Sequence, residues 1–202
     1  MYPSATKQSP ARGFTLIEVT VAIAILAVGL VALASMVAGT IKGTARSKYM
    51  SLAATLASEK LEDLNRWPAK DNNIAVTSGT TAGSLTSDVV QSVTVGATTE
   101  SVNYFDEVLF ASTQGAVSQT VSGLDNSSNV VYTTTTHQPD GTMGSTTSSA
   151  ATLPANTIAF KRRWLIEQDV PVTGVRRITI LVTLENDFVR PPVKFQMTTV
   201  RP

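Results

Sequence analysis

One stretch of this chain carries no charge, and it limits what the chain can fold into. From Val19 to Ile41 there is no Asp, Glu, Lys, Arg or His. These 23 residues, as an α-helix at ~1.5 Å per residue, span roughly 35 Å, enough to cross the hydrocarbon core of a bilayer. No proline interrupts the run, and Glu18 stands directly in front of it. The sequence therefore predicts a membrane-spanning helix with a carboxylate at its start.

The helical pattern continues beyond the apolar run. Apolar residues recur at spacings of three and four from Tyr49 to Trp67, and charged residues fill the other positions. Pro68 disfavours helical geometry at the residue before it. We therefore expect one helix from about Thr15 to Trp67, apolar all round in its first half and one-sided in its second.

Alternating apolar residues mark three strands at the C-terminal end. They cover Ile158 to Glu167, Arg177 to Glu185, and the residues around Val193, Phe195 and Met197. Short connections favour antiparallel neighbours. The predicted fold class is α+β, with the long N-terminal helix packed on a C-terminal antiparallel sheet.

The segment between helix and strands is rich in Ser, Thr, Gly and Asn. Short strands are expected at Val89 to Val95 and Val102 to Phe110, with a weaker candidate at Val130 to Thr136. Thr133 to Thr157 is interpreted as a loop, with a turn at Pro139 to Gly141.

Charge is distributed unevenly. Asp71 to Phe160 holds seven acidic residues and no Lys or Arg, whereas Lys161 to Pro202 holds eight basic and four acidic residues. We expect the two parts to neutralise each other; the alternative is a basic surface for an acidic partner subunit or for DNA. On a strand, the paired arginines 162–163 and 176–177 each place one side chain on either face.

Three local interpretations of Gly13 to Val19 compete. Thr15 and Glu18 fit a capping box at a helix start. Ala32 to Ala34 resembles a signal-peptidase site, although Glu18 would then lie inside the apolar region. A plain uncleaved anchor is the third possibility.

The segment also resembles a known family. A basic leader ending in glycine, then Phe-Thr-Leu-Ile-Glu-Val and an apolar helix, is similar to the type IV pilins and pseudopilins. The resemblance is specific over Arg12 to Ile41. It implies a pilin-like fold, cleavage by a prepilin peptidase between Gly13 and Phe14, and N-methylation of Phe14. It also implies that Glu18 pairs with the Phe14 amine of a neighbouring subunit during assembly.

The same resemblance implies a location and partners. The subunit would be a single-pass protein of the bacterial inner membrane with a periplasmic C-terminal domain, and would later enter an extracellular or periplasmic filament. Its partners would be other pilin or pseudopilin subunits. Small residues in the apolar helix, including Gly39 and Gly43 in a G-x-x-x-G pattern, suit close helix contacts, although alanine-rich helices also form readily by themselves.

Two features of many major pilins are missing from this sequence. Many major pilins carry a proline in the apolar helix and a cysteine pair near the C-terminus, and this chain has neither. It looks more like a minor pilin of the PilV kind or a minor pseudopilin of type II secretion. The expected division is a leader at 1–13, a transmembrane helix at 14–41, an amphipathic half at 42–68, an acidic loop region with short strands at 69–157 and a β-meander at 158–202.

Catalysis and cofactors find little support in the sequence. With no cysteine and one histidine, His137 in a Thr-rich segment, no catalytic set is predicted, and neither a cofactor nor a metal site is expected. Asp106–Glu107 is interpreted as a solvated strand end, and Asp125 to Asn129 as a turn rather than a calcium loop. Three hypotheses remain: a non-enzymatic filament subunit, an exposed domain that binds DNA or a surface, and an enzyme on an anchor helix.

Overall fold

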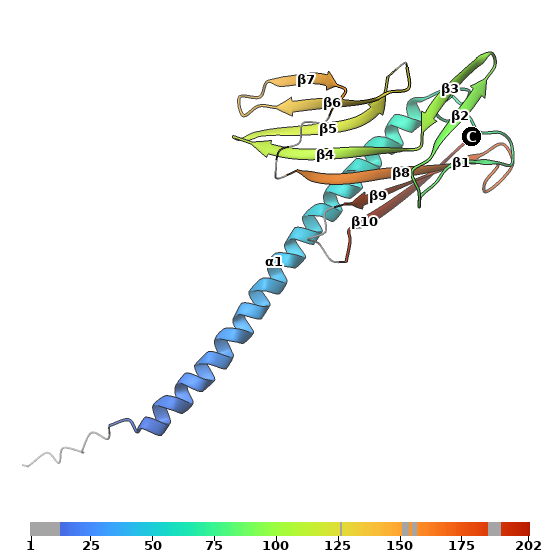
Figure 1. Ribbon diagram of the computed structural model, residues 1–202. Coiled ribbons are helices and arrows are strands. Elements are labelled where there is room, and N and C mark those ends of the chain that lie inside the picture. Colours follow the sequence, from blue (N-terminus) through green and yellow to red (C-terminus); the bar gives the residue numbers. More distant parts are fainter. Residues whose placement is uncertain (1–12, 126, 151–153, 155–156, 186–190) are drawn as a thin grey trace, which may run out of the picture. The chain divides into compact units, whose positions relative to one another are not determined.

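The computed structural model describes residues 13–125, 127–150, 154, 157–185 and 191–202. Its elements run from one long helix into a set of β-strands (Figure 1). Contacts divide the chain into two compact units, Met1–Thr44 and Ala45–Pro202.

Helix α1 spans Leu16–Arg66 without interruption, which confirms the prediction of one continuous helix. It begins directly after Thr15 and ends before Pro68, as the helix-start and proline signals indicated. In the first unit, its apolar residues are exposed throughout. In the second unit, its buried residues are Ala53, Leu56, Ala57 and Leu64, which repeat at helical spacing and form one face.

Ten strands follow α1 in the part of the chain that the structure describes. They are β1 (Thr81–Gly83), β2 (Val90–Val95), β3 (Thr98–Asn103), β4 (Phe105–Thr113), β5 (Ala116–Leu124), β6 (Val130–His137), β7 (Met143–Ser148), β8 (Ile158–Gln168), β9 (Arg176–Leu184) and β10 (Lys194–Arg201). The main sheet has the order β10-β9-β8-β4-β5-β6-β7, with β1 paired to β8 beyond the end of β4. Strands β2 and β3 form a separate hairpin, and every pairing is antiparallel.

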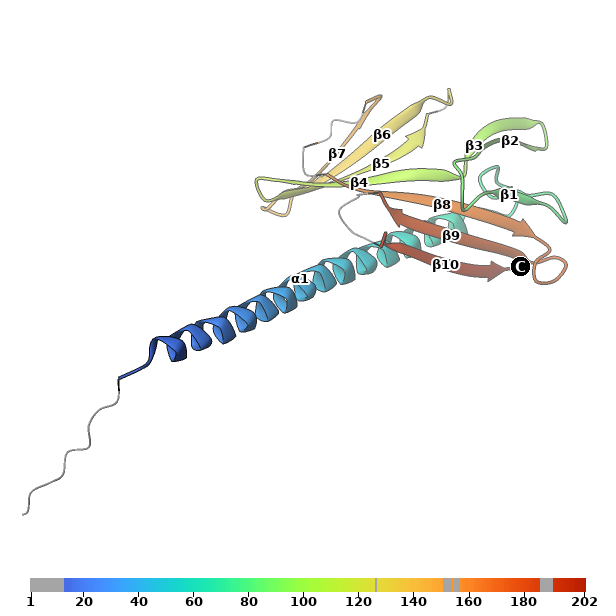
Figure 2. The same cartoon turned by 60° about the horizontal axis from the view of Figure 1, so that its bottom comes forward.

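The predicted C-terminal meander is confirmed. Strands β8, β9 and β10 are neighbours, and the apolar residues of β8 and β9 form one buried face. The buried part of α1 belongs to the same core (Figure 2). Among the core side chains, Phe160, Ile166, Ile178, Ile180 and Val182 have no exposed surface.

The weaker strand candidate Val130 to Thr136 is confirmed as part of β6. The overlapping segment Thr133 to Thr157, expected as a loop, instead forms most of a β-hairpin, and its residues 151–153 and 155–156 lie outside the described residues. Strands β6 and β7 pair from Tyr132–Ser148 to His137–Met143. Threonine favours strands because its branched side chain fits a pleated surface, and the absence of alternating apolar residues concealed this propensity. The predicted turn is confirmed: the Gly141 amide donates to Gln138 O (3.0 Å), and Gly141 has a φ of 85°.

A second expected strand, Val102 to Phe110, is two strands. The chain changes partner at Tyr104, so β3 pairs with β2 whereas β4 pairs with β5 and β8. The expected strand Val89 to Val95 is confirmed as β2. Its hairpin with β3 was not predicted; it turns at Gly96, whose φ of 63° suits glycine.

Gly83 shows how closely the chain packs at this switch point. Its φ is 82°, and an added Cβ would lie 2.2 Å from the carbonyl oxygen of Trp164 and 2.8 Å from the Cβ of Tyr104. A larger residue there would force β1 away from β8.

Candidate processing and assembly site

Residues Gly13 to Thr15 lead into the start of α1 and are exposed. Phe14 has 84 % of its surface exposed, and a Cβ on Gly13 would have no heavy atom within 4 Å. The peptide bond between these two residues therefore lies in open space. The leader before Gly13 lies outside the described residues.

Glu18 takes part in a capping box with Thr15. The Glu18 amide donates to Thr15 Oγ1 (3.3 Å), and the Thr15 amide donates to Glu18 Oε2 (3.4 Å). The carboxylate also lies at the positive end of the helix dipole, which favours its charge. The local interpretation of Glu18 is thus confirmed for the chain by itself.

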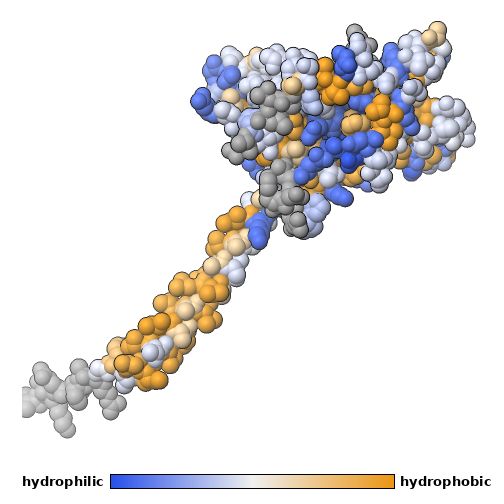
Figure 3. Space-filling view, viewed as in Figure 1, coloured by the Kyte–Doolittle hydropathy of each residue, from blue (hydrophilic) through white to orange (hydrophobic). Residues whose placement is uncertain are grey.

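The apolar part of α1 is long enough and apolar enough to cross a membrane, and none of its most apolar window is buried within the chain. Figure 3 shows its surface as largely hydrophobic. Gly39 and Gly43 also have open space where a Cβ would be. Gly39 and Gly43 therefore make no close packing contact within the described residues.

A buried charge cluster joins α1 to the sheet in the second unit. Arg162 Nε donates to Asp106 Oδ1 (2.6 Å) and its Nη2 to Oδ2 (2.8 Å), while Lys60 Nζ lies 3.3 Å from Oδ2. Lys60 Nζ also lies 4.2 Å from the ring centroid of Trp164. Asp106 and Arg162 are almost fully buried, so the interpretation of Asp106 as a solvated residue is wrong.

The sequence contained a signal for this cluster. Asp106 shares its strand face with Val108 and Phe110, and Arg162 shares its face with Phe160 and Trp164. Opposite charges at inward positions of two strands predict a buried pair, because an isolated buried charge costs several kcal/mol.

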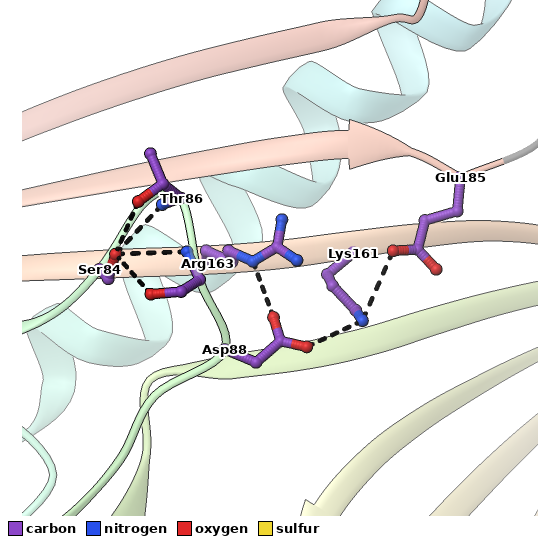
Figure 4. A network of polar contacts seen from close by, with 7 residues as sticks. Ser84, Thr86, Asp88, Lys161, Arg163 and Glu185 are labelled. Carbon is purple, nitrogen blue, oxygen red and sulfur yellow. Dashed lines mark hydrogen bonds and ion pairs between the residues drawn. The ribbon is translucent and has the colours of Figure 1, made fainter.

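The opposite face of β8 carries a second charge network (Figure 4). Asp88 Oδ1 accepts from Arg163 Nε (2.7 Å) and Oδ2 from Lys161 Nζ (3.1 Å), and Lys161 also pairs with Glu185 (3.5 Å). Burial alone would raise the pKa of Asp88, but the hydrogen bonds from Lys161 and Arg163 hold it below its usual value. Glu107 differs: burial, together with the charge of Glu185, raises its pKa.

The other C-terminal arginines that the structure describes have partners too. Arg177 makes a two-bond contact with Glu167 (2.6 and 2.8 Å). Arg201 donates to the carbonyls of Asn65 and Trp67, and Arg176 donates to Ala69 O and Gln168 Oε1, so these two hold the chain at the end of α1. Acidic and basic parts do neutralise each other, as expected, and each arginine pair divides between the two faces. These contacts occupy the arginines that the structure describes at the basic end.

The other candidate residues do not assemble into a reactive site. His137 is the last residue of β6, paired with Val117 and Met143, rather than part of a loop. Asp125 accepts from the amides of Ser127 and Asn129, which confirms a turn there. Among the residues that the structure describes, no group of three or more His, Asp or Glu side chains could hold a metal ion.

The comparisons with known proteins bear on the N-terminal segment. Residues 8–34 match the model of the prokaryotic N-terminal methylation motif. Searches among curated proteins and among solved structures gave no significant match.

The matched motif defines a class. It supports a relation to the type IV pilin-like proteins and indicates a precursor of the pilin or pseudopilin type. Such a motif implies processing by a prepilin peptidase, assembly with other pilins, and a structural subunit rather than an enzyme. The single apolar helix near the N-terminus is consistent with anchoring in the inner membrane.

Proposed function

We propose that this chain is a minor pilin, cut between Gly13 and Phe14, methylated at Phe14 and assembled into a filament through α1. The observation that carries the proposal is the methylation motif on an exposed Gly13–Phe14 bond, directly before an apolar helix whose surface the chain leaves bare. A minor pseudopilin of a type II secretion system would share this processing. The absence of cysteine, and of proline in the apolar helix, favours a minor over a major subunit.

Glu18 is proposed as the assembly residue. Cleavage would create an α-amino group at Phe14 with a pKa of about 8, hence mostly cationic. A carboxylate at the centre of a bilayer costs ~2.5–3.5 kcal/mol, and less near the interface, so a cation close to Glu18 offsets that cost. The capping bonds of Glu18 are long, at 3.3 and 3.4 Å, and weak bonds are readily exchanged for a charged partner.

The proposed domain arrangement follows from this role. After removal of residues 1–13, residues 14–41 would lie first in the membrane and then in the filament core. The amphipathic part of α1 and the sheet would face the periplasm. Binding of DNA by the exposed domain receives no support from the C-terminal arginines, because those described are held by acids, a glutamine or backbone carbonyls.

The test is the mass of the N-terminal peptide from protein recovered from membranes of the native host. We expect a peptide that begins at Phe14 and is heavier by one methyl group. An intact leader or a start at Ser35 would exclude the processing step. Glu18→Gln then tests assembly: it keeps a side-chain acceptor for capping and removes the charge, so we expect normal processing with loss of the chain from sheared filaments. Glu59→Gln, an exposed change on the same helix, is the control.

A further inference from the structure

A groove in the second unit lies between the end of α1, the starts of β3 and β4, and the β5–β6 connection. Its volume is about 700 Å³. The tryptophans of the chain, Trp67 and Trp164, both line it. Neither the processing motif nor the proposed assembly contact of Glu18 involves this groove.

The charged residues that line the groove are mostly acidic. Its charged lining residues are one base, Lys60, and four acids, Asp63, Glu100, Asp106 and Asp125. Two of these acids have cationic partners, because Arg162 pairs with Asp106 and Lys60 Nζ lies 3.6 Å from Asp63 Oδ2. Glu100 and Asp125 have no ion pair within the described residues. Hydrogen bonds from Asn129 and Ser127 lower the pKa of Asp125, so it stays ionised at neutral pH.

One lining residue of the groove offers a hydrogen-bond donor without an acceptor. Trp164 is only 4 % exposed, yet its Nε1 has no partner in the described structure. A buried N–H without an acceptor is unfavourable, so a ligand that supplies a carbonyl oxygen there would recover free energy.

These two properties together select the chemistry of the ligand. The exposed acids Glu100 and Asp125 attract a cation, and the unpartnered N–H of Trp164 attracts a neutral acceptor such as a peptide carbonyl. A phosphate backbone or an anionic lipid would meet Glu100 and Asp125 and be repelled. A polypeptide segment with Lys or Arg side chains supplies both a cation and a carbonyl.

We propose that this groove is a docking site for a basic segment of a neighbouring polypeptide subunit. The basic side chain lies against Glu100 and Asp125, and a backbone carbonyl accepts from Trp164 Nε1 once Lys60 moves off the indole. That the neighbour is a filament subunit rests on the proposed function; the chemistry of the groove does not. Segments of this kind exist in the chain itself, since Lys42, Arg46 and Lys48 make no ion pair within the described residues.

The tryptophans make the groove directly observable. The probe is a capped peptide with the sequence of Ile41–Lys48, titrated into the full chain in neutral detergent micelles while tryptophan fluorescence is recorded. The comparison peptide has Glu in place of each Lys and Arg. We expect a saturable fluorescence change with the basic peptide alone, and weaker binding at higher salt.

Two variants test the location. Glu100→Gln should weaken binding about threefold to fivefold, the size expected of one exposed ion pair. Trp164→Phe should weaken it by a similar factor through loss of one hydrogen bond, with Trp67 still reporting. Glu59→Gln changes an acid on α1 that does not line the groove and should leave binding unchanged.

The possible outcomes separate the explanations. No saturable change at millimolar peptide, an equal response to the acidic peptide, or equal loss with Glu59→Gln would overturn the proposal. Equal binding of a scrambled basic peptide would support a general basic segment and argue against a second copy as the specific occupant. Because the titration involves no cleavage, its failure would leave the processing proposal untouched, and an unprocessed N-terminus would leave the groove untouched.

Discussion

The two ends of the main sheet are stabilised by different interactions. Strands β8 and β9 bury Ile, Val, Leu and Phe side chains in a common core with α1. Strands β5, β6 and β7 bury little, and β7 is exposed at every residue. Pairs of hydroxyl groups connect them instead: Ser118 with Thr136, Thr120 with Thr134 and Thr133 with Thr147. We call β8 and β9, with the strand β4 and the part of α1 that pack on them, the apolar half, and it is stabilised by burial. We call β5, β6 and β7 the hydroxyl half, and it is stabilised by backbone hydrogen bonds between its strands and by hydroxyl contacts.

This difference indicates a division of labour. Apolar burial contributes about 25 cal/mol per Å², whereas one hydrogen bond contributes about 1 kcal/mol net. The apolar half therefore determines global stability. The hydroxyl half can change its surface at little cost, which suits a part that contacts partners.

The largest effect should come from the charged cluster within the apolar half. Asp106→Asn should lower the free energy of unfolding by about 3 kcal/mol, because it leaves Arg162 buried beside a neutral group. Urea unfolding of the full chain in detergent, followed by circular dichroism, measures this. Asp140→Asn, in the exposed β6–β7 turn, is the control. A loss below about 1 kcal/mol would mean that water reaches the pair.

A matched pair of valines tests the comparison next. Val182 on β9 is fully buried, whereas Val117 on β5 is 47 % exposed. Val182→Ala should cost about 2 kcal/mol, the transfer of two methyl groups plus a cavity, and Val117→Ala less than about 0.5 kcal/mol. Equal losses in the same urea experiment would contradict the distinction between the two halves.

The same distinction explains what sequence could predict. The apolar half was predictable, since Ile178, Ile180, Val182 and Leu184 alternate and the cover for them, Ala53 to Leu64, repeats at helical spacing. The hydroxyl half was predictable only in part. The sequence predicts β6 only weakly and predicts a loop in place of β7, because Thr133 to Thr136 and Thr146 to Thr147 carry no apolar alternation to separate strand from loop. The break at Tyr104 was missed since the apolar pattern continues through it while the partner strand changes.

The two candidate sites also differ in how far the sequence predicts them. The motif that includes Gly13 to Glu18 could be recognised from the sequence because it is a run of neighbouring residues. The groove around Trp164 could not, since it brings together α1, β3, β4, the β5–β6 connection and β8, which are far apart along the chain.

A smaller effect is expected on the outer face of the apolar half. Asp88→Asn removes the negative charge and one of the two acceptor oxygens that Lys161 and Arg163 share, and should cost at most about 1 kcal/mol at neutral pH, since the carboxylate is partly solvated. The folded-state pKa of Asp88 is lowered, so its contribution is present above its unfolded pKa of about 3.9 and is lost as pH falls through the folded value. The melting curves of both proteins should therefore converge as the pH falls from about 4 through the folded pKa of Asp88. A difference that persists at lower pH would assign the effect to something other than this carboxylate.

The smallest effect is expected in the hydroxyl half. Thr133→Val keeps the shape and strand propensity of the side chain and removes its hydrogen bond to Thr147 (3.3 Å). The expected loss is about 0.5 kcal/mol or less, because both side chains are exposed and cross-strand pairs contribute little individually. Thr134→Val makes the same change one residue further along β6, where the hydroxyl pairs with Thr120 (2.8 Å), and should cost more because the buried Thr120 then loses its partner away from water. If Thr133→Val cost as much as Thr134→Val in the urea experiment, even the exposed hydroxyl contacts would be structural supports in their own right, and the hydroxyl half could not be a region that changes its surface at little cost.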